Sequence, residues 1–212
     1  MQPSPLILGA PVVHWGFFEA GARDGIDFSN TYFMEKHLGW TGLCVEPNPV
    51  LMDKLLAFKQ RKECVRIPNC LSDEPMALDF LAYDSGLAGL AGSVNQDRVN
   101  AQLDERGMNR ADITKRIQCR RLTDVLLEND IHHVDFLSLD IEGAELSALK
   151  GLDFDKISVY ALMVENNDLC HNEDVRLYLE GYGYERVMVL GPDEVFVRKP
   201  GFSDSDHADS DH

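Results

Sequence analysis

Two groups of acidic and amide side chains follow long apolar stretches in the second half of the sequence. The stretch DIEGAE begins with Asp140, and the stretch VENNDLCH contains Glu165, Asn166 and His171. A carboxylate or an imidazole can accept a proton from a substrate hydroxyl if it lies within hydrogen-bond reach of that hydroxyl. Carboxylate and amide oxygens are also the ligands that Mg²⁺ and Mn²⁺ prefer. These residues therefore indicate either general-base catalysis or a divalent-cation site, with Asp140, Glu165 and Asn166 as the first metal ligands to consider.

Other acids and histidines near these stretches can be explained without a catalytic role. Glu142 and Glu145 lie at the expected start of a helix, where acids interact favourably with the helix dipole. This explanation fits Glu145 best. His132 and His133 precede an apolar stretch instead of following it, so we expect them at the opposite edge of the sheet from Asp140.

A second candidate site lies earlier in the chain, in the stretch FFEAGARDG. It contains Glu19, Gly21, Asp24 and Gly25 between an apolar stretch and a mixed one. Glycines between a strand and a helix let a ligand approach the backbone. Glu19 could accept a hydrogen bond from an ammonium group, and Asp24 could do the same or hold the loop closed. Three residues separate the glycines, unlike the GxGxxG of pyrophosphate-binding loops, so a nicotinamide cofactor is disfavoured. Glu46 follows 21 residues after Gly25, where an acid can accept hydrogen bonds from a ribose diol.

The rest of the chain supplies the elements that would position both sites. Apolar stretches of strand length alternate with stretches of helical spacing. We expect strands at 14–20, 41–47, 63–69, 77–83, 116–122, 133–140, 158–166, 184–190 and 194–199, and helices at 29–38, 49–62, 94–106, 122–130, 141–152 and 173–183. Repeated strand–helix units predict an α/β fold with a mostly parallel sheet and helices on both faces. The last two strands predict an antiparallel hairpin at its edge.

The length of 212 residues fits one domain, which we place at residues 1–202. Residues 86–110, a Gly-rich stretch followed by a polar helix, fall outside the regular alternation and are expected to form a lid over an acceptor. Three arginines of this stretch could contact that acceptor: Arg98, Arg106 and Arg110. The acidic, low-complexity residues 203–212 are expected to form a disordered tail.

Composition disfavours several classes of protein. The net charge of −16 argues against a general nucleic-acid binder, which normally has a basic face. No apolar run reaches membrane-spanning length, and the N-terminal stretch lacks the basic residues of a signal peptide. Five cysteines without a CxxC spacing indicate neither a disulfide framework nor a zinc site. We therefore expect a cytoplasmic protein with reduced thiols, and the sequence does not indicate its oligomeric state.

Several stretches taken together resemble the FkbM-type methyltransferases. EAGARDG, SNTYFMEK, LGWTGLCVEPNP, NCLSDE and LSLDIEGAELSALKGL occur in that order between residues 17 and 165. The resemblance implies the Rossmann-like seven-strand sheet of class I methyltransferases and the use of S-adenosylmethionine as cofactor. It also implies methylation of a hydroxyl oxygen, often on a saccharide or a glycosylated product. One departure is Arg23, at a loop position where these enzymes usually have asparagine.

The resemblance also implies roles for individual residues. The positions that match cofactor contacts are Glu19, Gly21 and Gly25 at the methionine part, Glu46 at the ribose, Ser72 and Asp73 around the adenine, and Asp140 at the methionine end. For the base that activates the acceptor, we consider Asp140, Glu165 and His171, with Mg²⁺ or Mn²⁺ as an alternative. The partner would be a small-molecule or glycan acceptor. Two other hypotheses stay open: methylation of a nitrogen on a small molecule or peptide group, and a Rossmann-like binding module without catalysis.

Overall fold

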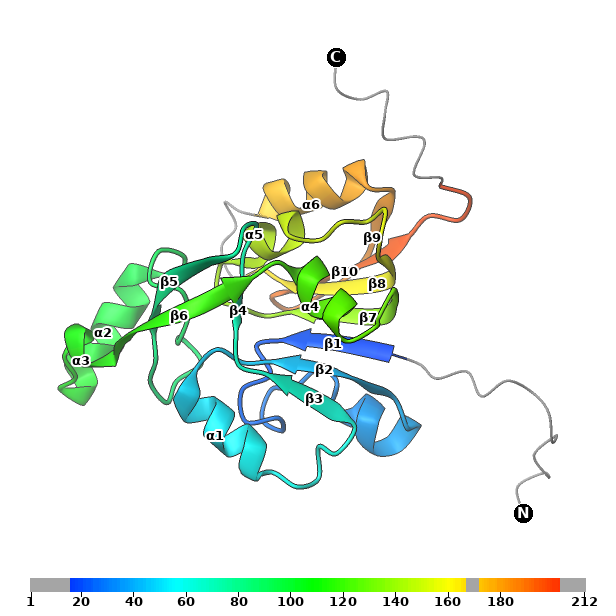
Figure 1. Ribbon diagram of the computed structural model, residues 1–212. Helices are drawn as coiled ribbons and strands as arrows, with labels where there is room; N and C mark the ends of the chain where they lie inside the picture. The colour runs from blue at the N-terminus through cyan, green and yellow to red at the C-terminus, as the bar shows by residue number, and fades with distance from the viewer. Residues whose placement is uncertain (1–15, 167–171, 203–212) are drawn as a thin grey trace.

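The computed structural model describes residues 16–166 and 172–202 (Figure 1). Seven strands form the main sheet in the order β3-β2-β1-β7-β8-β10-β9. Their bounds are β1 Gly16–Ala20, β2 Thr41–Val45, β3 Cys64–Ile67, β7 His133–Leu139, β8 Ser158–Glu165, β9 Tyr184–Leu190 and β10 Asp193–Arg198. The first five in this order are parallel, and β10 runs antiparallel to both β8 and β9. The predicted fold class, a mostly parallel seven-strand sheet with an antiparallel C-terminal hairpin, is confirmed.

Helices pack on both faces of this sheet. The helices α4 (Leu122–Glu128), α5 (Glu145–Lys150) and α6 (Asn172–Gly181) contribute to the main core, which joins them to the strands. The buried residues of this core include Phe18, Leu137, Leu162, Leu126 and Leu149. The helix α1 (Pro49–Ala57) packs against a smaller cluster that contains Phe17, Cys44, Met52, Leu55 and Cys64. Burial of apolar surface on both faces explains why the central strands are almost continuously apolar.

A second, three-stranded sheet has the order β4-β6-β5. It comprises β4 Cys70–Leu71, β5 Met76–Leu81 and β6 Thr114–Arg120, with β5 antiparallel to β6. The segment between β5 and β6 carries α2 (Gln96–Arg106) and α3 (Arg110–Ile113). In Figure 1 this unit extends to the side toward which β1 runs, which places the predicted lid beyond the carboxyl end of that strand. The strands predicted at 77–83 and 116–122 exist, but they flank this insertion and do not join the main sheet.

The structure differs from the sequence prediction at several helix boundaries. The predicted helix 29–38 is reduced to a five-residue π-helix, η1 (Met34–Leu38), because tertiary hydrogen bonds hold the preceding loop in an irregular conformation. The predicted helix 141–152 begins only at Glu145, since Glu142 and Gly143 have φ of 57° and 93°. A left-handed backbone cannot continue a right-handed helix.

Four cysteines form two disulfides, so the prediction of reduced thiols is wrong for them. Cys44 and Cys64 join β2 to β3, and Cys70 and Cys119 join β4 to β6. Each pair lies on neighbouring strands, a proximity that spacing along the chain does not reveal. Disulfides are typical of oxidising compartments, so the cytoplasmic location stays a prediction without support from the cysteines.

The remaining sequence predictions concern chain ends and one short segment. His171 and the acidic tail 203–212 lie outside the described residues. Among the residues that the structure describes, no helix is both long and apolar enough to cross a membrane.

Candidate active site

A cavity of about 420 Å³ lies at the carboxyl ends of β1, β2, β7 and β8. Its walls come from the loop after β1, the turn after β2, the loop after β5, and the residues that end β7 and β8. The lining includes Gly21, Arg23, Glu46, Ser85, Gly86, Arg98, Asp140, Glu142 and Glu165. The structure thus brings Gly21 together with the predicted acids Glu46, Asp140 and Glu165, although they are far apart in the sequence.

Gly21 lies where only glycine fits. Its φ is +86°, and an added Cβ would lie 1.9 Å from the backbone carbonyl oxygen of Asp140. The backbone N–H of Gly21 donates to the carbonyl of Val45 across the end of β2. The chain therefore turns sharply between two strand ends and leaves an open backbone surface at the cavity.

Gly25 has a different role from Gly21. It is buried outside the cavity lining, and an added Cβ would lie 2.5 Å from Cδ1 of Leu55. Its φ of +85° also requires glycine. Gly25 thus packs the loop against α1.

Glu46 lies directly after β2 and is 3% exposed. Its carboxylate accepts hydrogen bonds from the backbone N–H groups of Arg23 and Asn48, both at 2.8 Å. Burial raises the pKa of Glu46 to about 7, against the lowering effect of these two bonds. The bonds fix the carboxyl group at the cavity wall, at the position predicted for contact with a ribose.

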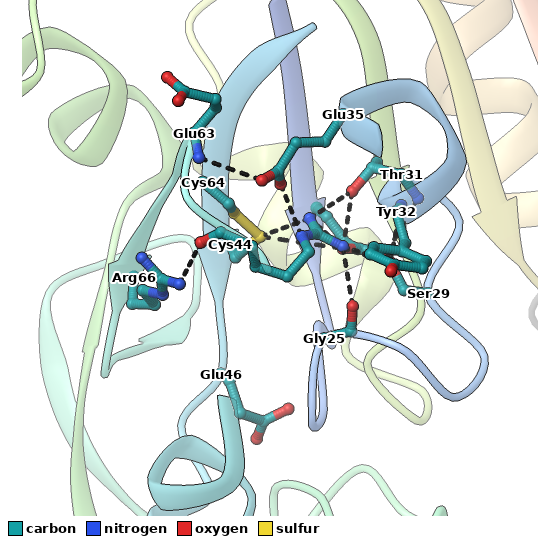
Figure 2. The surroundings of a disulfide bond; sticks show 12 residues. Gly25, Ser29, Thr31, Tyr32, Glu35, Cys44, Glu46, Glu63, Cys64 and Arg66 are labelled. Carbon is teal, nitrogen blue, oxygen red and sulfur yellow. Dashed lines mark hydrogen bonds and ion pairs between the residues drawn. A yellow bond between two sulfur atoms is a disulfide. The ribbon is translucent and has the colours of Figure 1, made fainter. Parts of the chain in front are cut away.

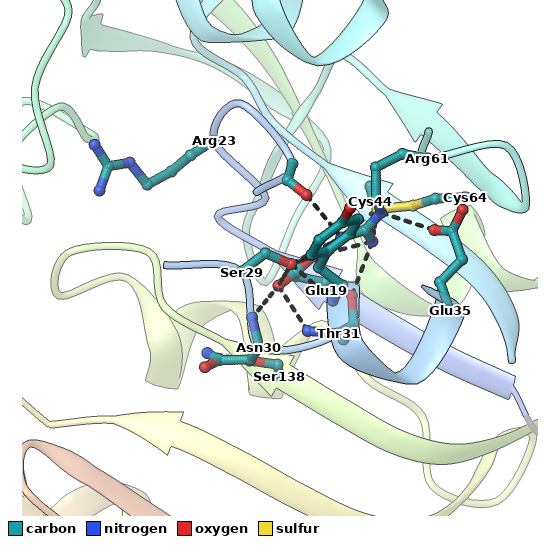
Figure 3. Close-up of polar contacts among 12 residues, drawn as sticks. Glu19, Arg23, Ser29, Asn30, Thr31, Glu35, Cys44, Arg61, Cys64 and Ser138 are labelled. Atoms are coloured by element: carbon teal, nitrogen blue, oxygen red, sulfur yellow. Dashed lines mark hydrogen bonds and ion pairs between the residues drawn. A yellow bond between two sulfur atoms is a disulfide. The ribbon is translucent and has the colours of Figure 1, made fainter. Parts of the chain in front are cut away.

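Glu19 and Asp24 shape the loop, and neither lines this cavity. Glu19 is 2% exposed and accepts hydrogen bonds from the backbone N–H of Asn30 and from the hydroxyls of Ser29 and Thr31 (Figure 3). Asp24 accepts from the backbone N–H groups two and three residues further on, which closes an exposed turn. Glu19 was predicted to contact the cofactor, and the structure places it in a supporting position instead. Asp24 holds the loop closed, which is one of the two roles expected for it.

Ser72 and Asp73 lie beside α5 and not beside Glu46. The Ser72 hydroxyl donates to the backbone carbonyl of Glu74, and the backbone N–H of Asp73 donates to Oγ of Ser147. Neither residue lines the first cavity. The loop at 85–89 lines it instead, together with Glu46. This displacement follows from the second sheet, which carries the chain after β3 away from the main sheet.

Three carboxyl groups of the cavity lining meet at one point. Asp140, Glu142 and Glu165 each offer an oxygen within 4.8 Å of the others. Burial raises the pKa of Asp140 to about 8, with a further contribution from its hydrogen bond to Glu165. Burial likewise raises the pKa of Glu142 to about 7, helped by the charge of Asp140. Carboxyl groups this close share protons or attract a cation, because they cannot all be ionised at low cost.

From the sequence, Glu142 is expected to be an acid at the start of a helix, but its side chain belongs to this carboxyl cluster. Its backbone φ of 57° is unusual for a residue other than glycine, and strained residues of this kind concentrate at functional sites. The signal in the sequence is the following Gly143, at which an added Cβ would lie 2.6 Å from the carbonyl oxygen of Ser93. Glu145, by contrast, accepts hydrogen bonds from the backbone N–H groups of Ile141 and Gly143 and so supports the helix start, as predicted.

A second cavity of about 410 Å³ adjoins the first. It lies between the N-terminal part of α2 and the helices α5 and α6, and its polar lining includes Asp73, Ser93, Asn95, Arg98, Glu142, Lys150, Glu165, Asn166 and Asp174. Arg98, Glu142 and Glu165 line both cavities. Two of the three clustered carboxyl groups therefore form the boundary between the cavities. Asn166, predicted as a metal ligand, lines the second cavity together with Glu142 and Glu165.

Comparisons with known proteins agree with this architecture. Methyltransferase sdnD from Sordaria araneosa is 31% identical over 155 residues, which cover 64% of this chain and 59% of that protein. The crystal structure of methyltransferase FkbM from Methylobacillus flagellatus KT superposes with a TM-score of 0.56 at 14% identity, over 87% of this chain and 43% of that one. At this identity the likeness shows a shared fold. The chain spans less than two thirds of the length of either protein.

The family profile described as the methyltransferase FkbM domain matches residues 19–186, which is most of the chain. The matched region contains the glycine turn at Gly21, Glu46 and all three clustered carboxyl groups. The chain therefore belongs to the FkbM family of methyltransferases.

Proposed function

We propose that this protein is an S-adenosylmethionine-dependent O-methyltransferase whose acceptor is a hydroxyl of a saccharide or of a glycosylated product. The observation that carries this proposal is the pair of adjacent cavities with Glu142 and Glu165 on their common boundary. A methyl donor and a hydroxyl acceptor need separate sites that meet at one point, where a proton acceptor is available. The clustered carboxyl groups supply that point.

The first cavity suits the cofactor. Gly21 lines this cavity, and a glycine at this turn lets the ends of β1 and β7 approach each other, so that backbone faces the space that we assign to the methionine part. The fixed carboxyl of Glu46 can accept hydrogen bonds from a ribose diol. The side chain of Arg23 points away from the polar contacts around Glu19 (Figure 3), and Arg23 lines the cavity. When bound, the cofactor supplies a methyl group that is already activated for transfer.

The second cavity suits a polyhydroxylated acceptor. Its lining combines hydroxyl, amide, carboxylate and cationic groups, among them Ser93, Asn95 and Lys150. Such groups can both donate to and accept from sugar hydroxyls. The helix α2 of the predicted lid contributes Arg98 to both cavities, which supports a role for the insertion in acceptor binding.

The residues of this chain would align the methyl donor with the acceptor and accept the proton of the acceptor hydroxyl. When the methyl donor and an acceptor are bound, a carboxylate at the boundary of the two cavities would accept the proton that the acceptor hydroxyl loses on methylation. Asp140, Glu142 and Glu165 are the candidate proton acceptors. The pKa of Asp140, about 8, and that of Glu142, about 7, match a base that works near neutral pH. His171 stays a sequence prediction, since it lies outside the described residues.

A divalent cation is the alternative way to activate the hydroxyl. Three carboxyl oxygens within 4.8 Å fit a hard cation such as Mg²⁺ or Mn²⁺. The candidate ligands are then Asp140, Glu165 and Asn166, as predicted from the sequence, together with Glu142. A cation here would lower the pKa of the acceptor hydroxyl, and a direct carboxylate base would not be required.

Calorimetry with S-adenosylhomocysteine, followed by a methyl-transfer assay on a panel of glycosides and amines, tests this proposal. We expect binding of the cofactor product and transfer to a glycoside hydroxyl. Transfer only to amines would favour the N-methyltransferase hypothesis. Binding without transfer to any class would favour a non-catalytic module, and tighter binding of NAD than of the cofactor product would refute the cofactor assignment. The cytoplasmic location and the acceptor's identity are predictions to be tested alongside.

A further inference from the structure

Arg61 is fully buried between α1 and β3, where its side chain has no exposed surface. Arginine is almost never fully buried unless it is paired. Here it forms ion pairs with two buried acids, Glu19 at 3.4 Å and Glu35 at 2.7 Å. The contact between Nε of Arg61 and Oε2 of Glu35 is ionic and lies outside hydrogen-bond geometry. The cluster therefore consists of one guanidinium between two carboxylates (Figure 3).

The same guanidinium reaches three positions in the loop that follows β1. Nη1 donates to the carbonyl of Gly25 at 3.1 Å and to the hydroxyl of Ser29 at 2.8 Å. Nη2 donates to the hydroxyl of Thr31 at 2.9 Å. Residues 21–31 of this loop contain no regular helix or strand, so these side-chain bonds replace the backbone ladder that would otherwise hold it.

Glu19 completes the support from the other side. It accepts hydrogen bonds from Ser29, Asn30 and Thr31, which lie at the end of the loop. Arg61 and Glu19 thus hold the same segment, one with donors and the other with acceptors. Removing the guanidinium would leave two buried carboxylates without a counter-charge, which is strongly unfavourable.

Arg61 also contacts the strand that presents Glu46. Its Nη2 lies 2.9 Å from Sγ of Cys44, two residues before Glu46 on the same chain segment. Figure 2 shows Glu46 beyond the end of the strand that carries this cysteine, with Thr31 and Glu35 grouped around the disulfide. One side chain therefore contacts both segments that end at the first cavity.

We propose that Arg61 is a positioning residue that sets the cofactor-binding loop and the end of β2 at their mutual spacing. It lines neither cavity, so it acts through Gly25, Ser29, Thr31 and Cys44 and not by touching a ligand. The inference rests on the proposed function for the identity of the ligand. The geometry of the loop itself, however, can be tested without any ligand.

The test compares Arg61→Lys and Arg61→Met with wild type and with Leu126→Ala. Leu126 is fully buried in α4 and lines neither cavity, so its truncation lowers stability without altering the loop. Binding of S-adenosylhomocysteine is measured by calorimetry below the melting transition of every variant. Hydrogen exchange of the backbone amides at 22–32 is measured in the unliganded proteins.

We expect Arg61→Met to weaken binding by about 30-fold or more and Arg61→Lys by about 10-fold, because lysine keeps the charge but lacks the planar fork. Exchange at 22–32 should become at least about 10-fold faster in both variants. Leu126→Ala should keep wild-type affinity and loop exchange despite a lower melting temperature. This contrast separates positioning of the loop from a general loss of stability.

Wild-type exchange at 22–32 in Arg61→Lys would overturn the inference, as would wild-type affinity in a folded Arg61→Met. If Arg61→Met does not fold, Ser29→Ala removes one loop partner of the guanidinium, and unchanged loop exchange in that variant would also count against the inference. If wild type itself does not bind S-adenosylhomocysteine, the proposed function fails. Loop exchange then still decides the role of Arg61.

Discussion

Replacement of Gly21 by alanine tests the turn on which the cofactor assignment depends. Two effects add at this position. The φ of +86° is unfavourable for an alanine by about 1 kcal/mol. The new Cβ would also lie 1.9 Å from the carbonyl oxygen of Asp140, although ordinary contacts of this type begin near 3.4 Å. The ends of β1 and β7 must therefore separate by more than an ångström.

That separation would break specific interactions. The backbone N–H groups of Gly21 and Ala22 donate to the carbonyl of Val45, and the N–H of Asp140 donates to the carbonyl of Ala20. Weakening these bonds and overpacking the turn should destabilise the protein by about 3–5 kcal/mol. For a chain of this size the melting temperature should fall by roughly 6–20 °C.

Gly39→Ala is the matched control. Gly39 also has a positive φ, +72°, but an added Cβ would meet nothing within 4 Å. Gly39→Ala should lower the free energy of unfolding only by the cost of the positive φ, about 1 kcal/mol. Circular dichroism during heating measures both variants, and calorimetry at low temperature should show at least about a tenfold loss of S-adenosylhomocysteine affinity for Gly21→Ala alone. Equal stability and equal affinity of the two variants would refute the reasoning.

Three further predictions concern the acidic groups and the insertion. The raised pKa of Glu46, about 7 against 4.5, means that the folded state holds a proton that the unfolded state releases between these pH values. Stability should therefore fall by about 3 kcal/mol as pH rises through that window, and Glu46→Gln should flatten this dependence in urea titrations; an unchanged slope would contradict it. Asp140→Asn and Glu165→Gln should each lower turnover by about 10²-fold or more while the fold survives, and EDTA followed by Mg²⁺ distinguishes a cation from a direct base; wild-type turnover in both variants would place the base elsewhere. Of the insertion 86–110, residues 86–89 line the first cavity and Ser93 lines only the second, so Ser93→Ala should impair acceptor use more than cofactor binding; equal loss of both in an unfolded protein would indicate a structural role.

Much of the architecture was predictable because it depends on local patterns. The strands that end at Glu46, Asp140 and Glu165 are continuous apolar stretches, and the parallel arrangement follows from their alternation with helices. In a parallel sheet, residues at the carboxyl ends of neighbouring strands lie together. The resemblance implied that Gly21, Glu46 and Asp140 share one cofactor site, and the structure brings them to one cavity together with Glu165.

The residues that hold the site in place could not be assigned from local patterns. Arg61 lies in the stretch KQRK, which looks like the polar end of a helix, yet its side chain is fully buried. Glu19 has the sequence context of a ligand, but its oxygens are occupied by the loop. Their partners are remote in the chain, and no spacing rule relates them.

Tertiary structure alone also decided which carboxyl group joins Asp140 and Glu165. Glu142 has the sequence position of a helix-start acid, but its backbone and that of Gly143 are left-handed, Gly143 packs closely against Ser93, and the Glu142 carboxyl joins the cluster. Periodicity reports which face of an element is buried, because burial repeats with the geometry of the backbone. Contacts between elements depend on how whole segments pack in three dimensions, and that packing brought Glu142 to the boundary of two cavities.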